Sequence, residues 1–230
     1  MKRTAASSGA AIAIAAIAIG LTGCSSSSSS NKASSTGNAA TTAKPQSKVA
    51  PRISAQGPNP SIASYFQQSH ITATPVHKGD PGAPVVNFPI PDGWADAGPD
   101  TPATAYWAIV DNGPEAAKYT PSIVATVSKL AGNVDQQKLL DLAAGEVKNL
   151  PGFKAMGDGS TATLANFPAS QLGGTWTQSG QTKAIAQKTV VIPGSDGVYL
   201  LRLSADCLDN QIDQALPATI TIDEKATITP

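Results

Sequence analysis

The sequence predicts an α+β fold in which helices pack on an antiparallel sheet. Three β-prone runs follow one another in the C-terminal half, and short turn sequences join them. These runs cover residues 172–177, 183–192 and 198–205. Consecutive strands joined by tight turns pair in antiparallel fashion. Apolar residues recur at helical spacing both before and after these runs, a pattern that indicates helices flanking the sheet.

The first predicted helix covers residues 60–69. Asn59 is placed as its N-cap, and Pro60 stands at the first helical position, where its missing N–H costs nothing. Apolar residues then recur at Ile62, Tyr65 and Phe66. Four short β-prone runs follow, separated by turn sequences rich in Gly, Pro and Asp. They cover residues 72–77, 85–88, 104–111 and 123–130.

The longest predicted helix covers residues 134–150. Asn133 and Gln136 are placed like an N-cap and its reciprocal N3 partner. The apolar stripe consists of Leu140, Ala143, Ala144, Val147 and Leu150. Because Pro151-Gly152 ends the pattern, we expect one continuous helix that stops there.

The last strand and the segment after it complete the prediction. The residues expected to share the buried face of this strand are Tyr199, Leu201, Leu203 and Ala205. Leu208, Ile212 and Ala215 indicate a final helix. Pro217 should kink or break that helix, unless a second helical segment starts there.

Residues 1–23 have the three-part layout of a secretory signal. The apolar run 10–19 is too short to span a bilayer. Leu21-Thr22-Gly23-Cys24 then matches the lipobox of bacterial lipoproteins, in which the signal is cut before a cysteine that receives a diacylglycerol. An ordinary signal with a chance cysteine is the alternative. We expect lipidation of Cys24, which anchors the mature protein at the outer, periplasmic face of the cell membrane.

Two further regions follow the signal. Residues 24–57 are rich in Ser, Thr, Ala, Asn and Lys, and they lack large apolar residues until Val49. Such a composition predicts a flexible tether, because little burial offsets its ordering entropy. Residues 58–230 are predicted to form a single domain.

The composition argues against a nucleic-acid binder and against a disulfide within the domain. Lys and Arg together number 16, as do Asp and Glu. A nucleic-acid binder normally carries a basic excess, so we expect no nucleic-acid partner. Cys207 has no intramolecular partner if Cys24 is acylated, which predicts a domain without a disulfide.

No catalytic or metal-binding pattern stands out. His70 and His77 lie in different predicted elements and lack ligands at metal spacing. Ser195 follows Gly194 but lacks the glycine that a nucleophile elbow needs two residues before its serine. Asp209 and Asp213 are one helical turn apart, the pattern of a solvated helix face. The sequence therefore predicts no enzyme and no cofactor.

Aromatic side chains are the remaining candidates for ligand binding. Exposed aromatics stack on sugars and line acyl grooves. The candidates are Trp94, Tyr106, Trp107 and Trp176. Filling of the hydrophobic core is the alternative role for each of them.

Several longer motifs resemble a known family. They are His70–Gly82, Ser128–Leu130, Glu146–Phe153, Gly157–Ser160, Ala162–Leu164, Ala186–Pro193, Ile222–Glu224 and Ile228–Pro230. Together with the lipobox, they are similar to the LpqN/LpqT family of mycobacterial lipoproteins, over essentially all of residues 61–230. Pro217 departs from the continuous last helix that we expect in this family.

The resemblance implies a PsbP-like α/β/α sandwich, with an antiparallel sheet between helices. It also implies a non-catalytic envelope lipoprotein that assists mycolate glycolipid export. The implied partners are trehalose glycolipids and RND-type exporters, and we expect the protein to be a monomer. No family motif assigns the ligand-binding residues.

Two other functions remain open at this point. A surface-displayed or shed protein that binds host proteins would present an exposed apolar patch without a cavity. A hydrolase of envelope lipids would need a nucleophile, a histidine and an acid in one arrangement, which the sequence does not suggest.

Overall fold

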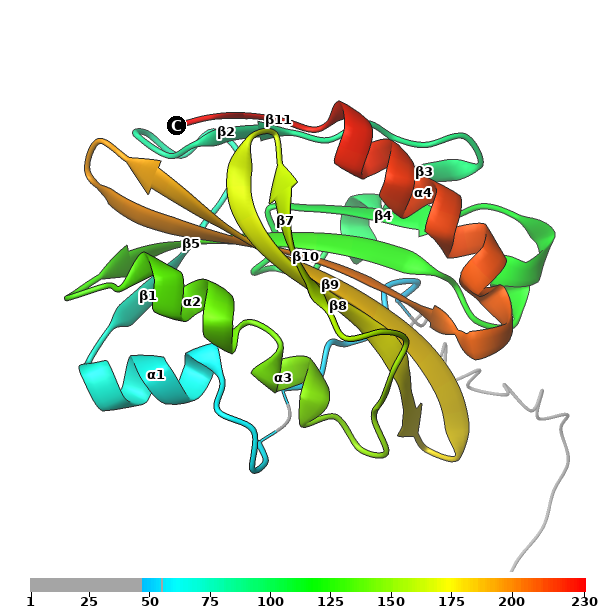
Figure 1. Ribbon diagram of the computed structural model, residues 1–230. Coiled ribbons are helices and arrows are strands. Elements are labelled where there is room, and N and C mark those ends of the chain that lie inside the picture. Colours follow the sequence, from blue (N-terminus) through cyan, green and yellow to red (C-terminus); the bar gives the residue numbers. More distant parts are fainter. Residues whose placement is uncertain (1–46, 55) are drawn as a thin grey trace, which may run out of the picture. The chain divides into compact units, whose positions relative to one another are not determined.

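The computed structural model describes residues 47–54 and 56–230, and it confirms an α+β fold around a large antiparallel sheet (Figure 1). The signal, Cys24 and most of the expected tether lie outside the described residues. The strand order is β3 (Trp94–Asp96), β4 (Trp107–Asp111), β5 (Ser122–Ala131), β10 (Gly197–Leu208), β9 (Gln181–Gly194), β8 (Phe167–Gln178) and β6 (Lys154–Ala155). In addition, β1 (Thr72–Val76) pairs with β5, β7 (Ser160–Leu164) with β8, and β2 (Val85–Asn87) with β11 (Thr227–Thr229).

The strands β8, β9 and β10 form the predicted antiparallel meander. β9 is hydrogen-bonded to both neighbours in continuous ladders. Ser179 and Gly180, which join β8 to β9, have positive φ angles of 50° and 79°. This is the conformation of a type I′ hairpin turn, whose twist matches that of the flanking strands.

Alternate residues of the meander face opposite sides of the sheet. On one side the predicted set Tyr199, Leu201, Leu203 and Ala205 is buried with residues of α4 (Ile212–Lys225), which are Ala215, Ala218 and Ile222. We call this side the α4 face.

The other side of the sheet packs against the helices of the first half of the chain. Val191 and Leu200 are buried with Ile62 and Tyr65 of α1 (Ile62–Ser69) and with Leu139 of α2 (Gln136–Leu142). Val147 of α3 (Gly145–Lys148) packs on Leu172 and Trp176. We call this side the α1–α3 face, and Figure 1 shows it opposite α4.

The start of α1 differs from the prediction. Ser61 is the N-cap: its hydroxyl accepts the N–H of Ser64, and the Ser64 hydroxyl accepts the N–H of Ser61. This reciprocal pair satisfies two N–H groups at the start of the helix. Asn59 instead contacts Asn149, since its N–H donates to Asn149 Oδ1 at 3.0 Å and its carbonyl accepts from Asn149 Nδ2 at 2.9 Å.

The single helix predicted over residues 134–150 is wrong. α2 ends at Leu142 and α3 begins at Gly145, while the N-cap of α2 is Asp135, not Asn133. At the start of α3 the backbone approaches the segment before α1, and a Cβ on Gly145 would lie 1.8 Å from the carbonyl oxygen of Pro60. This contact joins residues far apart in the sequence, so helical periodicity could not reveal it.

Pro217 does not break the last helix. α4 runs from Ile212 to Lys225 with Pro217 inside it. Pro217 and Asp213, whose carbonyl loses its helical donor, are both exposed, so water can serve that carbonyl. The hydroxyl of Thr221 also donates to the carbonyl of Pro217 at 3.0 Å.

The C-terminal part of the expected tether packs on the domain. Val49 is 4% exposed and belongs to a cluster that includes Ala108 and Val124. Arg52 donates to the carbonyl oxygens of Ser122 and Ser204 at 3.1 and 3.2 Å. The folded unit therefore includes residues 47–54, upstream of the predicted boundary at residue 58.

The contact at Gly145 gives a test of the fold. Gly145→Ala should lower the free energy of unfolding by about 1–3 kcal/mol, because the methyl group would overlap backbone that cannot move aside. Urea unfolding measures this loss. Gly173→Ala is the matched control, since its Cβ would have no atom nearer than 3.5 Å and should change stability little. Equal stability of both variants would contradict the packing of α3 on Pro60.

Candidate functional site

A large cavity lies between α4 and the α4 face of β8, β9 and β10. It has a volume of about 450 Å³ and adjoins a second cavity of about 200 Å³. The two share lining residues, so they form one continuous groove. The shared residues are Met156, Gly173, Ala186, Ala205, Leu216 and Thr219. We call this cavity the α4 groove.

The floor of the α4 groove is made by small residues in three adjacent strands. Ala186 pairs with Gly173 of β8 and with Ala205 of β10, while Ala184 pairs with Cys207. Residues directly opposite in paired strands point to the same face. Ala186 is exposed although β9 is a central strand. The short side chains thus leave an open hollow in the middle of the sheet.

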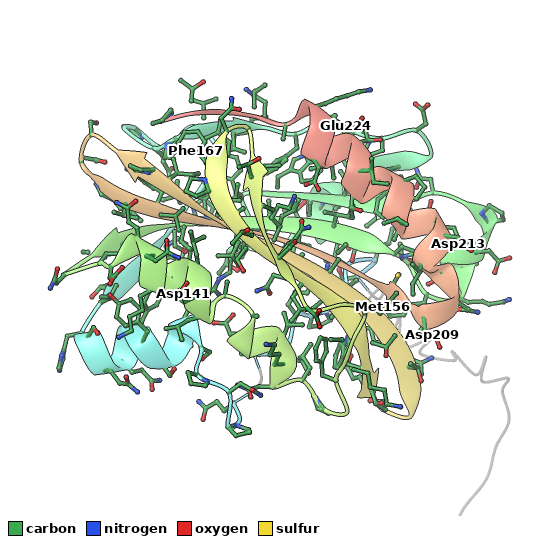
Figure 2. All side chains as sticks on the ribbon, viewed as in Figure 1. Asp141, Met156, Phe167, Asp209, Asp213 and Glu224 are labelled. Carbon is green, nitrogen blue, oxygen red and sulfur yellow. The ribbon has the colours of Figure 1, made fainter. Side chains whose placement is uncertain are left out.

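The rim of the groove carries three exposed apolar side chains. Met156, Leu216 and Ile220 are 59%, 52% and 48% exposed. Leu216 and Ile220 are one helical turn apart on α4, beside its buried face, and Met156 approaches from the chain between β6 and β7 (Figure 2). A cluster of large apolar side chains left in water at a cavity is typical of a binding surface.

The other end of the groove is polar. Lys188 of β9 and Asp223 of α4 form an ion pair of 2.7 Å across it. Gln171 Nε2 donates to Ser160 Oγ at 3.0 Å, and Asp158 lies beside them in the lining. The groove therefore joins an apolar part, nearer the start of α4, to a part that offers charged and hydrogen-bonding groups.

The four aromatic candidates are not brought together by the fold. Trp94 and Tyr106 are buried in the core of the α4 face. The Tyr106 hydroxyl accepts the N–H of Val86 and donates to the carbonyl of Pro84. Trp107 is half-buried and stacks on Phe88 with ring centroids 4.7 Å apart. Trp176 is buried on the α1–α3 face, and none of the four lines the α4 groove.

The residues that form the α4 groove were not predicted from the sequence. Its floor depends on side chains that are small, and Gly and Ala in strands carry no chemical signature. The exposed pair Leu216 and Ile220 is a usable signal, because it adds a second apolar stripe to a helix that already buries Ala215, Ala218 and Ile222. Cys24, the predicted lipidation site, lies outside the described residues.

Other chemistries find little support in the part of the chain that the structure describes. Its His, Cys, Asp and Glu residues form no group of three or more that could hold a metal ion. His70 terminates α1 with a positive φ of 52°, and His77 lies 3.8 Å from Asp80 at an exposed turn. Among the described helices, none has the length and apolarity needed to cross a bilayer.

Cys207 lines the apolar part of the groove and gives a test of its burial. Burial raises the pKa of this thiol to about 12, so the reactive thiolate is scarce at pH 8. Iodoacetamide should therefore modify Cys207 slowly in the folded protein and rapidly in guanidinium chloride. Peptide mapping by mass spectrometry reads Cys207 separately from Cys24. Fast labelling of Cys207 in the native protein at pH 8 would contradict its buried position.

Comparison with known proteins identifies relatives. Lipoprotein LpqN of Mycobacterium tuberculosis is 48% identical over 176 residues, which are 76% of this chain and 77% of that protein. The Proline-rich 28 kDa antigen homolog of Mycobacterium leprae is 24% identical over 162 residues, 70% of this chain and 58% of that protein. A crystal structure of LpqN from M. tuberculosis, described as involved in cell envelope biogenesis, matches with a TM-score of 0.71 and 47% identity, over 76% of this chain and 100% of that chain.

The family assignment follows from the extent of these matches. The family model described as "Probable lipoprotein LpqN" matches residues 58–229. This range is nearly the whole of the region in which the sequence motifs predicted the resemblance. The chain therefore belongs to the LpqN family of lipoproteins.

Proposed function

We propose that this protein is a non-catalytic accessory module of the cell envelope that binds a mycolate-based trehalose glycolipid in the α4 groove. The observation that carries the proposal is the junction of an apolar and a polar part in one continuous cavity. The proposal also rests on the relative from M. tuberculosis, which is described as involved in cell envelope biogenesis.

The chemistry of the groove matches the two ends of such a ligand. An acyl chain can lie on the floor of Ala184, Ala186 and Ala205 beneath Leu216, where each buried CH₂ contributes about 0.8 kcal/mol. Sugar hydroxyls can exchange hydrogen bonds with Lys188, Asp223 and the amide of Gln171. A binding module needs no further group, since no bond is made or broken.

The remaining parts of the proposal concern location and partners. Acyl chains on Cys24 would hold the protein at the outer face of the membrane, near RND-type exporters that deliver the glycolipid. Helices on opposite faces of the sheet suit a three-layer α/β/α sandwich of the PsbP-like kind. We propose that the protein works as a monomer.

One alternative has its own observation. The exposed rim of Met156, Leu216 and Ile220 could contact a host protein if the lipoprotein is displayed or shed. The cavity below the rim favours an amphiphile over a flat protein surface. A hydrolase has less support, because neither His70 nor His77 lines the α4 groove.

Filling the groove tests the proposal. Ala186→Leu places a larger side chain on the open floor, and it should weaken binding of a synthetic trehalose monoester at least tenfold, about 1.4 kcal/mol. Isothermal titration calorimetry measures the affinity. Ala73→Leu is the matched control, because Ala73 is an exposed strand residue of β1 that does not line the groove.

The ligand class is tested separately by native mass spectrometry after incubation with envelope lipid extract. We expect an added mass equal to a trehalose glycolipid on the wild type and on Ala73→Leu, but not on Ala186→Leu. Absence of a lipid adduct on the wild type, together with capture of a host protein by the wild type in a pull-down from host lysate, would favour the alternative. Equal affinity of both variants for the monoester would contradict the groove as the site.

A further inference from the structure

A second pocket lies on the α1–α3 face, on the opposite side of the sheet from the α4 groove. Its volume is about 160 Å³. Residues 51–54 form one wall, Glu146 of α3 another, and strands β5, β9 and β10 form the base. Charged side chains are concentrated there, whereas the floor of the α4 groove is apolar. The pocket opens on the other side of the sheet from the proposed glycolipid site, and the only lining residues that the two have in common are Ile185 and Gln187 of β9.

The charges around this pocket do not balance. Lys183 and Asp206, both 2% exposed, pair at 2.9 Å, and Arg202 pairs with Glu146 at 3.1 Å. Arg52 lies 4.0 Å from the same Asp206 oxygen that contacts Lys183. Three cations thus share two carboxylates. The hydrogen bonds of the Arg52 guanidinium go to neutral oxygens of Ala50, Ser122 and Ser204.

Hydrogen-bond donors around the pocket are also left without acceptors. Arg52 Nε, Trp176 Nε1 and Arg202 Nε are buried and have no hydrogen-bond partner in the described part of the protein. All three side chains line the pocket, and Trp176 is 3% exposed. A buried N–H without an acceptor costs free energy, so the cluster offers donors and one excess positive charge to an incoming group.

We propose that this pocket binds a small phosphate group through Arg52, Arg202 and the indole N–H of Trp176. Guanidinium groups bind phosphate oxygens with charge-assisted, often bidentate, hydrogen bonds. The added negative charge supplies the counter-charge that the three cations lack. Binding requires residues 51–54, which belong to no helix or strand, to shift so that the phosphate reaches the shielded donors.

The same chemistry could come from free phosphate or from the head group of a phospholipid. Two soluble probes distinguish these sources in calorimetric titrations of the full chain in detergent, namely inorganic phosphate and glycerophosphoinositol. We expect saturable binding of at least one probe, weakened by added salt. Tighter binding of glycerophosphoinositol identifies a lipid head group as the ligand, whereas tighter binding of inorganic phosphate identifies a free anion.

Three variants test the residues. Arg52→Gln and Arg202→Gln should each weaken phosphate binding at least tenfold. Trp176→Phe keeps a buried ring but removes the N–H, and it should weaken binding about threefold or more; it remains informative if an arginine variant fails to fold. Lys129→Gln is the matched control, since Lys129 pairs with Asp196 at an exposed site away from the pocket and should bind like the wild type.

The results that would overturn the proposal are definite. Absence of saturable heat with both probes would exclude a phosphate site. Wild-type affinity in folded Arg52→Gln, Arg202→Gln and Trp176→Phe would place any binding elsewhere. Loss of glycolipid binding in Ala186→Leu does not bear on this pocket, so the two sites can fail separately.

Discussion

The register between β9 and β10 is the constraint on which the α4 groove and the charged pocket on the opposite face both depend. Ala186 stands opposite Ala205, and Ala184 stands opposite Cys207, so the small residues of the two strands meet on the α4 face. Because side chains alternate along a strand, a slip of one residue would exchange the two faces. The same slip would place Asp206 and Lys183 on opposite faces of the sheet and break their ion pair. One pattern of backbone hydrogen bonds therefore places an apolar floor on one side and a charged cluster on the other.

The charged cluster is supported by its surroundings as well as by ion pairing. Lys183 Nζ lies 4.8 Å from the ring centroids of both Tyr119 and Trp176. The Tyr119 hydroxyl donates to Asp206, and burial, followed by the nearby Asp206 charge, raises the pKa of that hydroxyl. A buried ion pair gains little unless hydrogen bonds and further contacts offset its desolvation. Here aromatic faces and a phenol supply those contacts, and Arg52 is left as the cation with the weakest counter-charge.

Much of the fold could be predicted from local sequence, and the misses have physical reasons. The alternation of Tyr199, Leu201 and Leu203 reports burial of one strand face directly, and the structure confirms it. The break between α2 and α3 depends on Gly145 meeting the carbonyl of Pro60, a contact between residues far apart in the chain. The apolar periodicity of residues 134–150 cannot reveal this contact, because Pro60 lies outside that segment. The prediction of a kink or break at Pro217 was wrong because this residue lies on the solvent-exposed face of α4, where water can replace the lost backbone hydrogen bond.

The candidate site was harder to predict than the fold, because its main feature is missing volume. Aromatic residues attract attention as ligand contacts, yet Trp94, Tyr106 and Trp176 are buried and fill the core. The α4 groove arises where Gly173, Ala186 and Ala205 coincide in three adjacent strands. The alignment of these three small residues can be recognised only when the registers of the three strands are known. The one local sign of the groove is the exposed apolar pair Leu216 and Ile220, which lies on α4 beside its buried face.

Residues 47–54, which precede the predicted domain boundary, pack on one side of the sheet only. Val49 packs against Ala108 and Val124, and Arg52 bonds to Ser122 and Ser204, all on the α1–α3 face. Residues 47–54 therefore contact the domain on the side opposite the α4 groove. An amphiphile bound in the α4 groove, as we propose, would not compete with residues 47–54 for the same surface.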